Sequence, residues 1–359
     1  MQEYPTNDAA VSGAFSYKSY VFDPRPTFPF LSAVNRYWIP NSPHANDPDA
    51  LTLVMAHGAG FHKEQWEATI NDLQAVIDRG QEKAKIREIW AIDAPNHGDS
   101  AILNEDILKL GYEYSFPWEE YARSIHLFLS GLGTGVGVDF SGHNLVGIGH
   151  SMGTIALALS VGHYPKIRYA SLIHCELMMV PEAAVKHATD VVVRGSEKRR
   201  DIWPSKEDAY RTLKARGTWK TWDDRVLRSF VEFGLRPLPT SEYPDGKGVT
   251  LKCTRHQETA CYRNSTGSRR IYHSFDKFIK QVPTHLIYGA INDYLTAEII
   301  DDVINHKTGG VQNLASLSSV SSAGHMVVQI NPSELAEKIY AALVVSSKSM
   351  CFSHITPKL

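Results

Sequence analysis

The fold is decided by residues 145–156, whose sequence is LVGIGHSMGTIA. Its first four residues, Leu145 to Ile148, predict a buried strand, and the apolar run after Gly153 predicts a helix. The glycines of GHSMG predict a turn so tight that larger side chains would clash, which forces Ser151 towards a positive φ. Its hydroxyl then stands clear of the backbone at a helix N-terminus, where N–H groups favour developing negative charge.

A strand, a G-x-S-x-G turn and a helix in this order are typical of the nucleophile elbow of an α/β-hydrolase. A chance match in a loop is the alternative, and the strand and helix around Ser151 argue against it. We predict the α/β-hydrolase fold: a mostly parallel eight-stranded sheet, helices on both faces and a cap inserted between strands 6 and 7. The expected strands cover residues 17–22, 33–39, 51–56, 88–92, 145–148, 167–174, 283–289 and 314–320.

Composition excludes several other classes. The chain has 359 residues, 43% of them hydrophobic, and a formal charge of −2, so it can bury a large core and does not favour nucleic acid as a partner. Its four cysteines form no C-x-x-C pair and no secretory signal precedes them, so reduced thiols are expected. No apolar run approaches the ~18 residues of a membrane span. We expect no transmembrane segment, no metal site and no cofactor.

The rhythm of strands and helices breaks between residues 181 and 281. This segment carries 21 Lys and Arg against 13 Asp and Glu, together with several tryptophans and phenylalanines. We predict a cap, or lid, over 181–281 and a hydrolase core over 1–180 and 282–359, with a flexible tail over about 346–359. A basic, aromatic cap suits an apolar acyl chain joined to an anionic group. Alternatively, its charges are only solvated loop residues.

A serine hydroxyl needs a base to take its proton and an acid to orient that base. In this fold the chain order is Ser, then Asp or Glu, then His. Ser151 is the expected nucleophile, and His325, in the Gly-His that follows the last predicted strand, is the expected base. A purely structural role for His325 is the alternative.

The acid is ambiguous. The usual site follows the seventh strand in a G-x-x-D pattern, but Gly289-Ala290-Ile291-Asn292 places an amide there. Asp293 lies one residue late, and Glu176 follows the sixth strand, which is the other place for a triad acid. We favour Glu176, because Asn292 cannot supply the charge that stabilises an imidazolium, and Asp293 stays a candidate.

The oxyanion hole is expected from two backbone N–H groups. The third strand runs into His57-Gly58-Ala59-Gly60, and an N–H of this loop forms half of the hole in the fold. We choose Ala59 for that half and Met152, directly after the nucleophile, for the other. His57 is interpreted as a structural hydrogen-bonding residue. The later loop from Asp93 to Ser100 is interpreted as a structural turn.

These motifs together resemble a group of fungal peroxisomal α/β-hydrolases. They are His57 to Gly60, the run Asn96-His97-Gly98-Asp99-Ser100-Ala101, Gly149 to Gly153, Glu176 and the C-terminal Pro-Lys-Leu. The group includes acyl-CoA hydrolases of secondary-metabolite pathways, hydrolases of toxin biosynthesis and a peroxisomal lipase. The resemblance implies thioester or ester hydrolysis in the peroxisome, with the triad acid after the sixth strand. Family members often show Ile-Glu-Pro there, whereas this chain has Cys175-Glu176-Leu177, which leaves the register of Glu176 open.

The last three residues, Pro357-Lys358-Leu359, are similar to the tripeptide read by the peroxisomal import receptor. We therefore expect that receptor as a partner and a peroxisomal location; a frayed, meaningless terminus would leave the protein cytoplasmic. A homodimer stays open.

The leading hypothesis is a serine hydrolase of acyl-CoA thioesters, with a small-molecule acyl thioester or ester as its partner. A carboxylesterase, lipase or lactonase would use the same residues. A non-catalytic binding protein on a hydrolase scaffold is the alternative from another class, and the complete set of Ser, His and acid argues against it.

Overall fold

The computed structural model describes residues 15–80 and 84–353. An eight-stranded sheet in the order β1-β2-β4-β3-β5-β6-β10-β11 forms its centre. Strands β1 and β2 are antiparallel to each other, β2 is antiparallel to β4, and the remaining neighbours are parallel. The strands are β1 (Ser16–Phe22), β2 (Ser32–Trp38), β3 (Leu51–Ala56), β4 (Ile86–Ile92), β5 (Asn144–His150), β6 (Tyr169–Cys175), β10 (Thr284–Gly289) and β11 (Ser316–Val320). The predicted fold is confirmed.

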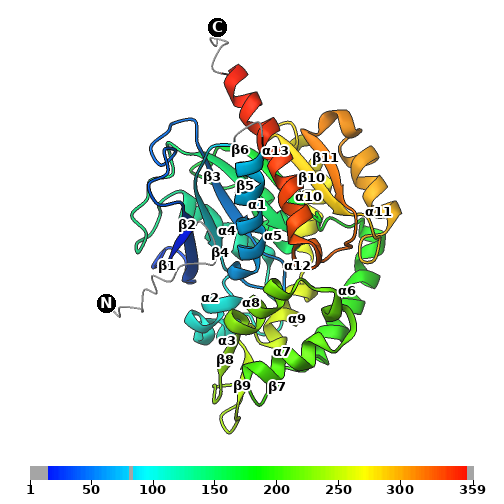
Figure 1. Cartoon of the computed structure of the whole chain (residues 1–359). Helices are drawn as coiled ribbons and strands as arrows, with labels where there is room; N and C mark the ends of the chain where they lie inside the picture. The colour runs from blue at the N-terminus through cyan, green and yellow to red at the C-terminus, as the bar shows by residue number, and fades with distance from the viewer. Residues whose placement is uncertain (1–14, 81–83, 354–359) are drawn as a thin grey trace.

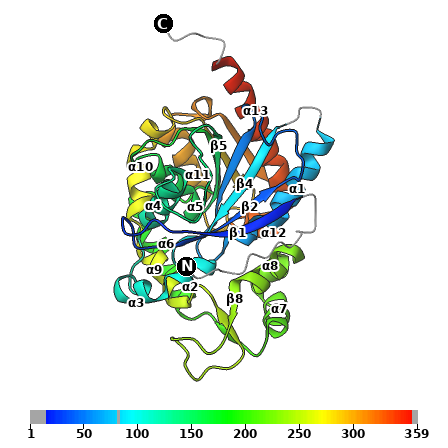
Figure 2. The ribbon, with the colours of Figure 1, turned by 90° about the vertical axis from the view of Figure 1, so that its left-hand side faces the viewer.

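Helices cover both faces of the sheet, as Figure 2 shows with the sheet seen towards its edge. One face carries α4 (Trp118–Leu129), α5 (Met152–Ser160) and α10 (Thr266–Phe278), and the other carries α1 (Glu67–Arg79) and α13 (Pro332–Ser353). The inner strands are apolar along their whole length because both faces are covered: every residue of β3 is buried. The sheet therefore separates two large apolar clusters.

The elements between β6 and α10 form an insertion that lies beyond the sheet, in the lower half of Figure 1. It has a small antiparallel sheet of its own and an apolar cluster around Trp203, Leu227 and Phe230. Arg225 joins it to the core through two hydrogen bonds to Asp72, of 2.7 and 2.8 Å. Its elements before α10 are α6 (Glu182–Glu197), β7 (Ile202–Trp203), α7 (Lys206–Lys214), the 3₁₀ turn η2 (Gly217–Thr221), α8 (Asp224–Gly234), β8 (Leu235–Pro237), β9 (Val249–Leu251) and α9 (Arg255–Arg263).

Short helices complete the chain. They are the 3₁₀ turn η1 (Lys63–Trp66), α2 (Gly98–Leu103), α3 (Glu105–Gly111), α11 (Ala297–Asp301), the π-helical turn η3 (Asp302–Lys307), the 3₁₀ turn η4 (Val311–Asn313) and α12 (Val327–Ile330). In the described part of the chain, no helix combines the length and apolarity needed to cross a bilayer.

Helix α10 falls inside the segment 181–281, which the sequence assigns to the cap, yet it packs with the core. Its Ile271 and Phe275 are buried in the same apolar cluster as Ile155 of α5 and Ile125 of α4. Ala260 and Cys261 of α9 belong to that cluster too, so the last part of the segment 181–281 packs with the core.

Helix α13 covers part of the predicted C-terminal tail. The sequence predicts a flexible tail over about 346–359, and the structure places the residues up to Ser353 in α13, so the flexibility of this segment stays a prediction. Ser346 is buried, and its hydroxyl lies 2.7 Å from Ser171 Oγ and 3.0 Å from His285 Nε2, which explains why the helix stays packed there. The final tripeptide lies outside the described residues.

Candidate active site

The elbow holds Ser151 between β5 and α5 in a strained backbone conformation, with φ 52° and ψ −117°. The positive φ predicted from the sequence is confirmed, and such a conformation costs of order 1–3 kcal/mol. The flanking glycines are required by close approach. A Cβ on Gly153 would lie 2.2 Å from Ala56 O, and one on Gly149 would lie 2.7 Å from the carbonyl carbon of Gly153.

The imidazole of His325 lies between Ser151 and Glu176. Its Nε2 is 2.9 Å from Ser151 Oγ, and its Nδ1 is 3.0 Å from Glu176 Oε2. A carboxylate only accepts hydrogen bonds, so Nδ1 donates, and the Nε2 of the neutral ring is left to accept the serine proton. The three side chains thus meet in the geometry that can activate a hydroxyl.

Glu176 is itself held firmly at the end of β6. Its carboxylate is almost fully buried, and Oε1 accepts the N–H of Gly289 at 2.5 Å. Its own N–H donates to Ile287 O at 2.8 Å, and its φ is 59°. This left-handed residue turns the side chain from β6 towards the loop that carries His325. The sequence contains no sign of this second strained residue.

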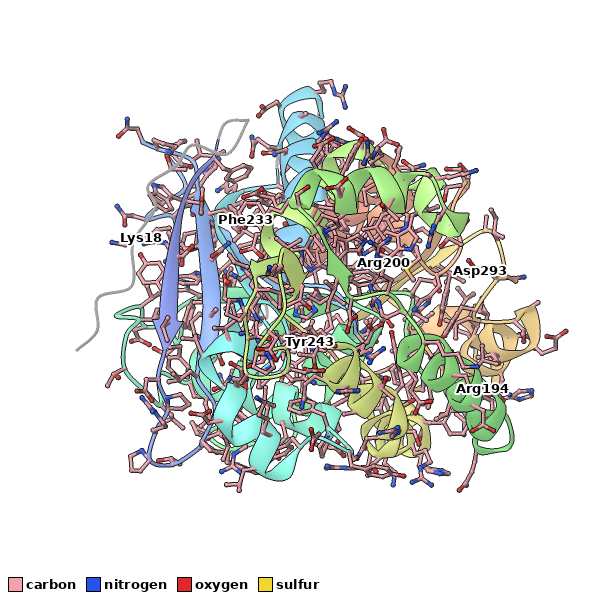
Figure 3. All side chains as sticks on the ribbon, turned by 90° about the horizontal axis from the view of Figure 1, so that it is seen from below. Lys18, Arg194, Arg200, Phe233, Tyr243 and Asp293 are labelled. Carbon is pink, nitrogen blue, oxygen red and sulfur yellow. The ribbon has the colours of Figure 1, made fainter. Side chains whose placement is uncertain are left out.

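Asp293 lies elsewhere in the site. It is exposed on the loop after β10, and Figure 3 labels it. Its Oδ1 accepts the backbone N–H groups of His325, at 2.8 Å, and Tyr294, at 2.7 Å. The structure therefore brings Glu176 to the imidazole of His325, and Asp293 to the backbone of the same residue.

Tyr294 is a neighbour that the sequence reasoning missed. Its ring stacks on the imidazole of His325 with a centroid distance of 4.9 Å and an interplanar angle of 22°. It lies one residue after Asp293, so the loop after β10 holds His325 by its backbone and by one face of its ring.

Two N–H groups near Ser151 remain for an oxyanion. Met152 begins α5, so its N–H has no acceptor within the helix. In the loop after β3, Gly60 N–H donates to His97 Nε2 at 2.8 Å and Phe61 N–H donates to Gly58 O at 3.3 Å. Ala59, which directly precedes Gly60, has an N–H without an acceptor among the described residues, and Ala59 and Ser151 line the same cavity.

Two neutral histidines hold the loop that carries Ala59. Burial lowers the pKa of His57 to about 3, and its Nδ1–H donates to Gly58 O at 2.8 Å while Nε2 accepts from Ala94 N–H at 3.0 Å. This is the structural role that the sequence predicted for His57. Burial likewise lowers the pKa of His97 well below its usual value, so its Nε2 stays free to accept from Gly60.

A chain of hydrogen bonds links this loop to the insertion. His97 Nδ1–H donates to Asn96 Oδ1 at 2.8 Å, and Asn96 Nδ2 donates to Gln257 O of α9 at 3.2 Å. The sequence reasoning treated Asn96 and His97 only as part of a turn. Their partners come from distant segments, so no local pattern identifies them.

Lys63 anchors the end of the same loop. Its amine is buried and lies 3.1 Å from Asp93 Oδ2, 2.7 Å from Asp99 Oδ2 and 2.7 Å from Glu64 Oε1. Its backbone N–H donates to Asp93 Oδ1 at 2.8 Å. Asp93 begins the turn after β4, so these bonds tie that turn to the loop carrying Ala59.

Ser151 borders a cavity of about 460 Å³ that lies between the core and the insertion. Ser151 and His325 lie in its wall, and the surface of that wall is mainly apolar. Its apolar side chains include Trp118, Met178, Val180, Val192, Trp219 and Trp222. Such a wall suits an apolar acyl group.

Many of the insertion's basic residues have acidic partners. Arg236 pairs with Glu105 at 2.7 Å, and Arg263 pairs with Glu197 at 2.5 Å. Of the described residues that line the cavity, only Arg199 is a lysine or arginine, and it pairs with Glu258. The described lining of the cavity therefore holds no lysine or arginine without an acidic partner.

The sequence matches the Alpha/beta hydrolase family over residues 53–338. It is 30% identical over 206 residues to a type I acyl-CoA thioesterase of Penicillium brevicompactum, an alignment that covers 57% of this chain and 44% of that protein. The chain therefore spans less than half the length of this curated relative. It is also 25% identical over 307 residues to the Saccharomyces cerevisiae peroxisomal membrane protein LPX1, covering 80% of this chain and 74% of that protein.

Solved structures share the architecture. The S. cerevisiae peroxisomal alpha-beta-hydrolase Lpx1 has a TM-score of 0.67 at 18% identity, covering 96% of this chain and 90% of the other. A thioesterase domain from the curacin biosynthetic pathway has a TM-score of 0.58 at 18% identity, covering 88% and 95%. At these identities the likeness concerns the fold.

Proposed function

The chain belongs to the alpha/beta hydrolase family, and on that premise we propose that it is a serine hydrolase that cleaves a thioester or ester, with acyl-CoA thioesters as its leading substrates. The observation that carries this proposal is the imidazole of His325, hydrogen-bonded to Ser151 on one side and Glu176 on the other. The thioesterase relatives favour thioesters, and the apolar cavity favours an acyl chain.

The proposed reaction has two halves. Ser151 Oγ attacks the carbonyl carbon while His325 Nε2 takes its proton, and the Glu176 carboxylate stabilises the resulting imidazolium. The N–H groups of Ala59 and Met152 bind the oxyanion of the tetrahedral intermediate. His325 then gives the proton to the leaving thiol or alcohol, and an acyl-enzyme remains.

Water completes the cycle. His325 removes a proton from a water molecule, which attacks the acyl-enzyme, and the proton returns to Ser151 as the acid leaves. In this scheme Asp293 is a positioning residue, because its carboxylate meets the backbone of His325. The insertion over 181–281 acts as the lid that encloses the acyl group, with α10 packed on the core.

The proposed location is the peroxisome. The C-terminal Pro-Lys-Leu supports this, as does the peroxisomal name of the yeast relative. The import receptor is the partner that such a tripeptide would bind.

A fluorophosphonate probe tests the chemistry directly, because it reacts with an activated serine. Labelling of the wild type and none of Ser151→Ala is expected. Matched octanoate substrates, one a CoA thioester and one a simple ester, then distinguish a thioesterase from a carboxylesterase by their kcat/KM values. A folded wild type that is neither labelled nor active on either substrate would be a binding protein on this scaffold.

A further inference from the structure

A buried ion pair interrupts the mostly apolar wall of the cavity. Arg199 follows α6 and donates from Nη1 to Oε2 of Glu258 on α9. The two side chains are 20% and 8% exposed, and Tyr262 OH donates to Glu258 Oε1 at 3.2 Å. Burying such a pair costs desolvation that well-packed apolar residues would avoid, so stability does not explain its place in the wall.

The guanidinium of Arg199 has unused donors. Arginine carries five N–H bonds, and among the described residues Glu258 is its hydrogen-bond partner. The Nε–H and Nη2–H groups are therefore left without a protein acceptor. Because Arg199 lines the cavity, these donors are available to a ligand there.

The pair lies close to the reacting carbonyl. A Cβ built on Gly60 would be 2.8 Å from Glu258 Oε1 and 3.7 Å from Arg199 Nη1. Gly60 directly follows Ala59, whose N–H is the proposed oxyanion donor. A substrate group that reaches the pair is thus within a few bonds of the scissile carbon.

We propose that Arg199 and Glu258 recognise a hydroxyl group of the substrate, close to the scissile carbonyl, on either the acyl chain or the alcohol part. A hydroxyl accepts from Arg199 and donates to Glu258. A carboxylate would be repelled by Glu258, and an alkyl group would leave the donors unpaired. This inference deepens the proposed function and rests on it for the identity of the scissile bond.

Binding to the inactive Ser151→Ala protein tests the proposal without turnover. Calorimetry compares 3-hydroxyoctanoyl-CoA with octanoyl-CoA in one arm, and 2-hydroxyethyl octanoate with ethyl octanoate in the other. We expect the hydroxylated ligand of one arm to bind roughly tenfold to a hundredfold more tightly, as hydrogen bonds to charged groups do. The arm in which the hydroxylated ligand binds more tightly shows whether the recognised hydroxyl belongs to the acyl chain or to the alcohol part. Equal affinities in both arms would overturn the proposal.

Added substitutions assign the effect to the pair. Arg199→Met with Glu258→Gln, in the Ser151→Ala background, is expected to abolish the preference. Arg263→Met with Glu197→Gln is the matched control, because Arg263 and Glu197 also join α9 to α6, at 2.5 Å, outside the cavity lining. A preference that survives the first pair of changes, or falls equally with the control, contradicts the assignment.

A third variant guards against misfolding. Arg199→Lys keeps the charge pair and removes the fork of donors, so the preference should fall at least severalfold in a protein whose melting temperature is unchanged. Because binding is measured on an inactive protein, a wild type that fails to hydrolyse any substrate refutes the proposed function separately from this inference.

Discussion

Glu176 Oε2 lies 3.0 Å from His325 Nδ1, across the imidazole ring from Ser151 Oγ. This hydrogen bond joins the end of β6 to the loop after β11 and fixes the position of the imidazole beside Ser151. A buried carboxylate there fixes the tautomer of the ring and supports the positive charge that forms on it.

Replacing Ser151 by alanine should abolish turnover and fluorophosphonate labelling while leaving the melting temperature near or above that of the wild type. The positive φ of Ser151 is strained for any non-glycine residue, so removing the hydroxyl does not add strain. His325→Ala should be nearly as damaging, and the double variant scarcely worse, because the two act as a unit. Rates measured on purified, folded variants decide this, and additive losses would count against a shared mechanism.

Glu176→Gln should lower kcat by ~10³–10⁴, as neutralising a triad acid does elsewhere. Asp293→Asn is the matched control and should cost about tenfold or less, because an amide oxygen still accepts the N–H of His325. Steady-state kinetics of the two variants show which of them loses more kcat. A severe loss in Asp293→Asn beside a mild one in Glu176→Gln would place the acid after β10.

His97→Leu should lower kcat roughly tenfold to a hundredfold with a smaller change in KM, because it frees Gly60 N–H and loosens the loop that carries Ala59. Loss of a whole oxyanion donor costs ~10²–10³, which sets the upper bound. His97→Gln keeps an acceptor for Gly60 and should retain most of the activity. If both variants lose activity equally, the hydrogen bond from Gly60 is not the cause.

Glu67 should make stability fall as pH rises. Burial raises the pKa of Glu67 to about 8 from an ordinary 4.5, with the charge of Glu64 adding to the shift. Between these values the unfolded chain releases the proton that the folded protein holds, so the free energy of unfolding falls across pH 4.5–8. Glu67→Gln should remove this dependence. The free energy of unfolding of the variant should therefore rise relative to that of the wild type as pH increases. Urea melts at pH 5 and pH 8 measure it; a constant difference between the two proteins would contradict the assignment.

Removing Pro357-Lys358-Leu359 should redirect the protein from peroxisomes to the cytosol without changing kcat/KM in vitro. The tripeptide resembles a receptor-read address, and the site residues lie far from it in the chain. Fluorescence microscopy of a fusion with the tag at the N-terminus makes the comparison. Unchanged peroxisomal import after truncation would show that another signal directs it.

The elbow, the eight strands and the candidate base were predictable because their signals are local or follow from chain order. Residues 145–156 carry their own strand, turn and helix patterns, and the G-x-S-x-G pattern predicted the positive φ of Ser151. The place of Ser346 in α13 was not predictable, because its partners Ser171 and His285 come from distant strands.

The sequence by itself determined the hydrolase fold, the elbow serine and the order of the candidate triad. Only the tertiary structure decided which of the two carboxylates meets the imidazole of His325. Strand β6 pairs with β10 so that Cys175 lies opposite Ile287, and this register places Glu176 beside Gly289. The positive φ of Glu176 then directs its carboxylate to Nδ1 of His325. Asp293 ends on the backbone of the same residue. A few ångströms separate these two outcomes, and they depend on strand register and loop conformation, which no run of neighbouring residues encodes.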